Sequence, residues 1–231
     1  TQLTFQATSS TTILDISSRF PGFDTGRYSI HIEPASLTDS IETNFPPLPA
    51  NVNVYFAGNV DVINSYGESY LASGFTIDEK NAALRGFQQY SQIANVTFAI
   101  VDDPAQANLI LLNRPGSTPA GQAALSFFGD NQINGVSYHS DVIEIFSDYP
   151  GIREGAFAPG TYGYFNLLHE LGHTLGLSHP FEDQAGSGSI PGAIYTYQFG
   201  DFGLGQGVYT LMSYLNGLSE KDGVSFPFFY G

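Results

Sequence analysis

The sequence predicts an α+β fold, in which a twisted, mixed sheet of five strands is accompanied by two long helices. Three observations lead to this prediction. Short apolar runs with strand-like alternation recur between residues 52 and 146, a helix signal interrupts them at residue 76, and an apolar helical stretch around His169 follows them. With 231 residues, 42% of them hydrophobic, the chain can bury a full core as one large domain, or as one domain plus a fragment.

Residues 1–49 are expected to be β structure and loop that precede the main domain. Residues 11–16 and 27–32 alternate in strand fashion and are separated by Pro-Gly and Thr-Gly turn signals. Residues 25–32 resemble the last strand of a bacterial pre-peptidase β-sandwich domain, and an arm packed on the next domain explains them equally well. The stiff, proline-rich run at 45–49 is the best boundary in the chain. We therefore assign residues 1–49 to an N-terminal β-rich arm, or to the remnant of a preceding β domain.

Residues 50–231 form the main domain, and its elements follow one another in order. Residues 76–79 (Thr-Ile-Asp-Glu) are a capping box that opens a helix to about Ile93, with Leu84, Phe87 and Tyr90 expected on its inner side. Strands are expected at residues 52–57, 96–101, 108–112, 123–128 and 142–146. The helix around His169 would pack on one face of the resulting sheet.

Residues 169–179 carry the spacing H-E-x-x-H-x-x-G-x-x-H. On a helix, His169 and His173 are one turn apart, so both imidazoles leave the same face and suit two ligands of a zinc ion. Gly176 is expected to end the helix, because glycine adopts the left-handed conformation of a sharp reversal, and His179 then returns as a third ligand. Glu170 directly follows the first ligand, which places its carboxylate beside the metal. Three protein ligands with an open fourth position describe a catalytic zinc site and not a structural one.

The long motif resembles that of the metzincin metalloproteases. The Gly-Leu-Ser-His-Pro at 176–180 and the Gly-Thr-Tyr-Gly-Tyr-Phe run at 160–165 are most similar to the serralysin branch. Residues 209–214 resemble the Met-turn beneath the zinc, and Met212 is the only methionine in the chain. The resemblance extends over about residues 50–216. It implies a zinc cleft between an upper and a smaller lower subdomain, Met212 as structural support, and Tyr214 as an additional zinc ligand that swings away during catalysis.

The motif and the resemblance together predict a secreted zinc endopeptidase. In the predicted mechanism zinc activates a water molecule, Glu170 takes its proton as general base, and Tyr214 stabilises the oxyanion. In serralysin-like folds the strand matching residues 121–128 is the exposed edge above the cleft. Ala123, Ala124 and Leu125 therefore either pair with an extended substrate or are plain sheet structure. The alternatives are a catalytically inactive zinc-binding surface or adhesion module, against which the intact Glu170 argues, and a structural zinc domain, against which the open position argues.

Composition narrows the range of partners. The chain has 7 Lys+Arg and 22 Asp+Glu, a formal charge of -15, and its basic residues are scattered, so no nucleic-acid-binding patch is visible. The absence of cysteine excludes disulfides and thiolate ligands, and no apolar run approaches the ~18 residues of a membrane span. We expect protein or peptide substrates, a monomer, an extracellular location in a bacterium and, as a candidate partner, a proteinaceous inhibitor. The chain begins at Thr1 without a signal peptide, which indicates a processed or shortened protein.

Zinc is the only cofactor that a motif supports. Calcium stays possible without a motif: the calcium-binding repeats of serralysins do not occur in the sequence, and Glu182 and Asp183 could contact calcium but are better interpreted as solvated loop acids. His139 precedes a predicted strand and has no partner at ligand spacing, so at most it lines the cleft. Residues 216–231 show no helical period, and we therefore expect the helix that metzincins place after the Met-turn to be missing.

Overall fold

The computed structural model describes residues 48–116, 122–153, 157–182 and 189–215, and the backbone of residues 220–221 and 224–225. The predicted strands at 11–16 and 27–32 and most of the proline-rich boundary lie outside the described residues, as does Asp183. In the segment predicted to lack a helix, the described residues form the short antiparallel pair β8 (Glu220–Lys221) and β9 (Val224–Ser225).

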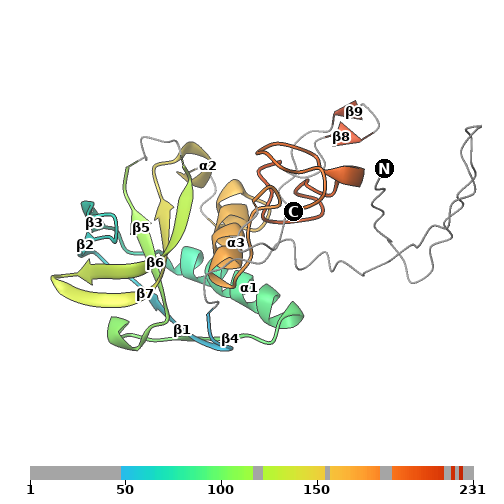
Figure 1. The fold of residues 1–231 in the computed structure, drawn as a ribbon. Helices are drawn as coiled ribbons and strands as arrows, with labels where there is room; N and C mark the ends of the chain where they lie inside the picture. Colours follow the sequence, from blue (N-terminus) through green and yellow to red (C-terminus); the bar gives the residue numbers. More distant parts are fainter. Residues whose placement is uncertain are drawn as a thin grey trace, which may run out of the picture.

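A single mixed sheet organises the described residues, with the strand order β3-β2-β6-β7-β5-β1-β4 (Figure 1). β1 is parallel to β4 and β5, and β5 is parallel to β7, whereas β6 is antiparallel to β7 and β2 is antiparallel to β3 and β6. The strands are β1 (Asn51–Phe56), β2 (Val60–Ile63), β3 (Ser69–Ala72), β4 (Thr97–Ile100), β5 (Leu109–Arg114), β6 (Ala124–Ile133) and β7 (Val136–Phe146).

The mixed α+β architecture is confirmed, but the sheet has seven strands instead of five. The five predicted strands are present as β1, β4, β5, β6 and β7. The prediction missed the hairpin of β2 and β3, in which Ser-Tyr-Leu-Ala of β3 shows no strand-like alternation. It also cut the β6–β7 hairpin short, so His139, predicted to precede a strand, lies within β7.

Two long helices pack on one face of the sheet, α1 (Ile77–Ile93) and α3 (Tyr162–Thr174), and the short α2 (Pro150–Arg153) precedes α3. The capping box of α1 is confirmed: the Thr76 hydroxyl accepts from the Glu79 N–H (3.2 Å), and the Glu79 carboxylate accepts from the Thr76 N–H (2.7 Å). The core between sheet and helices includes Val54, Leu109, Leu111, Ile143, Ile145, Phe87, Tyr90, Leu167 and Leu171.

One predicted inner residue of α1 is wrong, because Leu84 is 42% exposed. The buried residues of this helix are Ala82, Ala83, Gly86, Phe87 and Tyr90. A side chain at Gly86 would meet Leu168 of α3, since a Cβ there would lie 2.9 Å from Leu168 Cδ2. The contact between the helices therefore requires a small residue at position 86. At 100° per residue Leu84 falls outside the arc of the buried positions, so it faces solvent.

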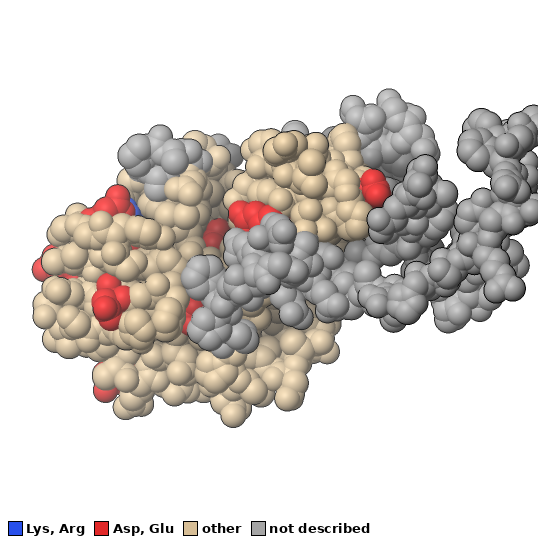
Figure 2. Space-filling view, in the orientation of Figure 1, with Lys and Arg blue, Asp and Glu red and all other residues tan. Residues whose placement is uncertain are grey.

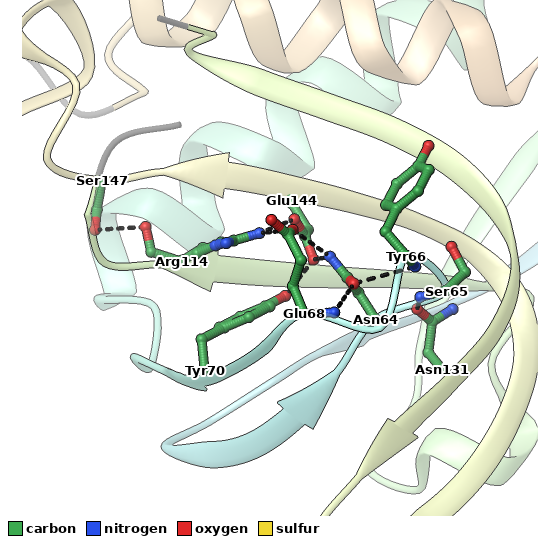
Figure 3. Close-up of polar contacts among 9 residues, drawn as sticks. All are labelled: Asn64, Ser65, Tyr66, Glu68, Tyr70, Arg114, Asn131, Glu144 and Ser147. Atoms are coloured by element: carbon green, nitrogen blue, oxygen red, sulfur yellow. Dashed lines mark hydrogen bonds and ion pairs between the residues drawn. The ribbon is translucent and has the colours of Figure 1, made fainter. Parts of the chain in front are cut away.

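The β2–β3 hairpin forms one edge of the sheet, and its buried side chains pack with those on the face opposite to the helices. A buried polar network holds the hairpin in place (Figure 3). Glu144 of β7 has a fully buried side chain, and it accepts hydrogen bonds from Tyr70 Oη, from Asn64 Nδ2 (3.2 Å) and from Arg114 Nη1 (3.1 Å). Arg114 also pairs with Glu68 at 2.7 Å. Because a buried carboxylate without partners is costly, these donors fix the hairpin to the end of β5 and β7.

α3 lies between the sheet and the segment of residues 189–215, which is coloured orange to red in Figure 1. No helix in the described part of the chain is long and apolar enough to cross a membrane. On the face drawn in Figure 2, acidic side chains are separated by uncharged surface and basic ones are almost absent, so this face has no cation-rich patch.

Candidate metal centre and catalytic site

The end of α3 brings the three histidines of the motif together. The helix ends at Thr174, and Gly176 follows with a φ of +98°, in the left-handed region expected of it. Two reverse hydrogen bonds close the turn, from Gly176 N to the His173 carbonyl (3.0 Å) and from Leu177 N to the Gly172 carbonyl (2.9 Å). The chain therefore reverses, and His179 returns to the helix face that carries His169 and His173.

The Nε2 atoms of the three histidines converge on one point. His179 Nε2 lies 3.2 Å from His169 Nε2 and 3.1 Å from His173 Nε2, and one ring nitrogen from each residue lies within 4.8 Å of the others. Among the described residues, this is the only group of three or more His, Cys, Asp or Glu side chains with such a spacing.

The partner of the second ring nitrogen, Nδ1, determines which nitrogen of each imidazole carries the proton. His169 Nδ1 lies 2.9 Å from the Leu211 carbonyl, and His173 Nδ1 lies 2.8 Å from the Leu177 carbonyl. A carbonyl oxygen only accepts, so both Nδ1 atoms carry hydrogen and both Nε2 atoms present a lone pair. Nδ1 of His179 lies 2.9 Å from the Glu182 carboxylate, which favours the same tautomer.

Three lone pairs that face one another have no donor among them, and a cation at their centre satisfies all three. Burial lowers the pKa of His169, and it lowers the pKa of His173 to about 4 and that of His179 to about 3, so the imidazoles are neutral at neutral pH. Neutral imidazole nitrogens are ligands that zinc prefers. The residues present therefore fit a zinc ion held by His169, His173 and His179.

Glu170 is buried beside this group and directed at the sheet. Its Oε2 accepts a hydrogen bond from Ser126 Oγ at 2.7 Å, and Ser126 belongs to β6. Burial raises the pKa of the Glu170 carboxyl, whereas His173, when protonated, and the hydrogen bonds from the side chain and backbone of Ser126 lower it. A raised pKa makes the carboxylate a better proton acceptor, as a general base requires.

Met212 and Tyr214 lie beneath and beside the histidines. Met212 is buried, and a Cβ built on Gly172 of α3 would come 2.6 Å from its Sδ, so the glycine is what lets the two segments approach. The Tyr214 ring lies 4.6 Å from the His179 ring and 5.9 Å from the His169 ring, measured between centroids. Burial raises the pKa of Tyr214 to about 12, so its hydroxyl remains protonated at neutral pH.

Two contacts between side chains of the site were not predicted from the sequence. Glu182 was interpreted as a solvated loop acid, but its carboxylate lies against His179, which a spacing of three residues in a loop did not reveal. Ser126 lies one residue beyond the predicted edge residues. Because side chains alternate along a strand, Ser126 lies on the same face as Ala124, and this alternation is the signal that could have identified it. His139, in contrast, pairs with Asp130 on the exposed surface of the hairpin (2.7 Å).

The free edge of β6 lies next to the site. Ala123 and Ala124 are buried in the core and Leu125 is partly buried, so the side chains of these residues pack within the protein. Phe146 N donates to the Ala123 carbonyl, which marks this pair as hydrogen-bonded across β6 and β7. Because such pairs alternate, the backbone groups of Ala124, Ser126 and Phe128 point away from β7. Among the described strands, β2 pairs with that side of β6 only at its end, opposite residues 132 and 133.

Comparisons with known proteins indicate the same class of protein as the motif. The chain is 30% identical over 158 residues to Metallopeptidase AprA of Pseudomonas marginalis, covering 66% of this chain and 30% of that protein. It is 30% identical over 123 residues to Serralysin B of Dickeya chrysanthemi, covering 50% of this chain and 24% of that protein. It is 41% identical over 69 residues to Serralysin of Proteus mirabilis, covering 30% of this chain and 13% of that protein.

The similarity is thus confined to part of longer proteins, since the chain matches 30% or less of the length of these curated relatives. No family model matches the chain. A solved structure of myroilysin aligns with a TM-score of 0.35 and 18% identity, covering 64% of this chain and 57% of that one. The matches to AprA and the serralysins confirm the predicted resemblance to serralysin-like metzincin metalloproteases.

Proposed function

We propose that the chain carries the catalytic centre of a secreted, zinc-dependent endopeptidase that cleaves extended stretches of protein. The observation that carries this proposal is the convergence of three Nε2 lone pairs beside a buried carboxylate. The similarity to proteins named as metallopeptidase and serralysin supports it. We further propose that residues 50–231 form the catalytic domain, with the cleft between the sheet and the segment that carries Met212.

His169, His173 and His179 would hold the zinc, and their Nδ1 contacts keep the rings in the orientation that binding requires. When bound, zinc supplies a Lewis acid that polarises the scissile carbonyl and lowers the pKa of a water molecule. Glu170 takes the proton from this water and passes it to the leaving amine. The protonated hydroxyl of Tyr214 donates a hydrogen bond to the oxygen of the former carbonyl as it gains negative charge.

The substrate would lie extended along β6. The outward N–H and C=O groups of Ala124 and Phe128 are available to pair with a peptide strand, and the same strand carries Ser126 against Glu170. Backbone pairing of this kind recognises an extended chain with little regard for its side chains. We therefore propose peptide segments without regular structure as the substrate class, with a bacterial, extracellular setting as the resemblance implies.

The test is hydrolysis of an unfolded protein and of a quenched fluorescent peptide, before and after removal of metal by a chelator. We expect hydrolysis that is lost on chelation and restored by zinc. Glu170→Gln keeps the size of the side chain but removes the base, and it should lower kcat by 10²–10⁴-fold or more while zinc stays bound. Glu79→Gln is the matched control, because Gln serves equally well in the capping box of α1.

Each rival function predicts a different outcome of this experiment. A zinc-binding module without activity would bind zinc but hydrolyse nothing in either state. A structural zinc site would show unfolding of the chain on chelation. Hydrolysis by Glu170→Gln at the rate of the control would mean that Glu170 is not the base.

A further inference from the structure

Ser126 makes a contact that no part of the histidine motif requires. It lies on β6, opposite Ile143 of β7, and its hydroxyl donates to Glu170 Oε2 at 2.7 Å across the space between sheet and α3. A donor to an ionised carboxylate forms a short, strong hydrogen bond, and this distance is typical of one. The residue thus joins the strand that faces the substrate to the proposed base.

Glu170 needs such a partner because of its position. Glu170 is buried, so little water reaches its carboxylate to orient it. A glutamate side chain has three rotatable bonds, and fixing them in advance removes an entropic cost from each catalytic cycle. The Ser126 hydroxyl is a hydrogen-bond donor that α3 does not itself provide.

We propose that Ser126 is a positioning residue that holds the Glu170 carboxylate in the orientation from which it accepts a proton. This inference rests on the proposed function. The Ser126 backbone also donates a hydrogen bond to Glu170, whereas the outward groups of Ala124 and Phe128 are the ones that pair with substrate. The Ser126 hydroxyl therefore affects the rate of the chemical step and not the affinity for substrate.

The first arm of the test compares the kinetics of wild type, Ser126→Ala, Ser126→Thr and the control Ser137→Ala. Ser137 is an exposed serine of the same hairpin, so its replacement makes the same chemical change away from the site. We expect Ser126→Ala to lower kcat about tenfold with KM little changed, as loss of a hydrogen bond to a charged group implies. Ser126→Thr keeps a hydroxyl at this place and should restore most of the rate. Zinc content should be equal in all four proteins.

The second arm needs no activity. Thermal unfolding of the metal-free wild type, Ser126→Ala, Glu170→Ala and the double variant forms a double-mutant cycle. If the two side chains interact, the shifts in the unfolding midpoint are not additive, and we expect a deviation of roughly 2–4 °C.

Three results overturn the inference: additive shifts in the cycle, a kcat of Ser126→Ala equal to that of Ser137→Ala, or a loss of zinc from Ser126→Ala that matches its loss of rate. The last result would show that Ser126 supports the metal site and not the base. Failure of the proposed function is separate, because it shows as a wild-type protein that hydrolyses no peptide with zinc bound.

Discussion

Replacement of Tyr214 by phenylalanine separates the packing of this residue from its chemistry. The ring lies 4.6 Å from His179 and 5.3 Å from Phe181 between centroids, and Phe keeps both contacts. The free energy of unfolding should therefore change by less than about 0.5 kcal/mol. The lost hydroxyl is a donor at neutral pH, because burial raises its pKa to about 12. If it stabilises the oxyanion, its loss removes an interaction that is stronger in the transition state than in the ground state.

The expected result is a kcat lowered by about 10²-fold, or roughly 2.7 kcal/mol of activation free energy, with KM little altered. Zinc should remain at one ion per chain, since the three histidines are unchanged. The assay is steady-state hydrolysis of a fluorescent peptide, with zinc measured in the same preparations. Tyr209→Phe is the matched control, because this exposed tyrosine precedes Met212 in the same segment. A kcat of Tyr214→Phe equal to that of the control would refute the oxyanion role and leave the three-histidine site standing.

Four further substitutions test other parts of the molecule. His179→Ala removes one of three proposed ligands, so less zinc should remain after dialysis against a mild chelator, and unchanged stoichiometry would place the third ligand elsewhere. Arg114→Met leaves the buried Glu144 with fewer donors and should destabilise the fold by about 3 kcal/mol in urea unfolding. Glu68→Ala, which removes a half-exposed partner of the same arginine, should cost less than about 1 kcal/mol, and equal losses would contradict the network. Burial raises the pKa of Asp141 to about 7, so the folded protein holds a proton that the unfolded chain releases above about pH 4. Stability should fall as pH rises through this window, and Asp141→Asn should gain relative to wild type at pH 8 compared with pH 5. The same difference at both pH values would show that this carboxyl is not perturbed.

The sequence predicted the elements whose signals are local and strong. The capping box of α1, the left-handed Gly176 and the apolar strands each follow from a few neighbouring residues. One local signal was overlooked: Asn134-Gly135, with φ of +50° and +78°, is the turn that joins β6 to β7 and extends both strands.

Other features depend on contacts between distant segments, which a single sequence does not reveal. One is the close approach of α1 to α3, where a side chain at Gly86 would meet Leu168. The contact of Ser126 with Glu170 joins residues 44 positions apart, and it depends on the register of β6 on β7. In both cases tertiary packing decides which side chains are buried and which meet.

The three histidines that would hold the zinc lie within residues 169–179, and this short span limits what the metal can do for the rest of the chain. An ion that joins distant segments closes a large loop and removes much conformational freedom from the unfolded chain, whereas one held by a single helix end closes a small loop. The sheet, α1 and the Glu144 network make no use of it. We expect such a chain to reach its fold before it acquires zinc, and to survive the loss of the ion with its core intact. Metal supply would then regulate whether the protein is active without deciding whether it is folded.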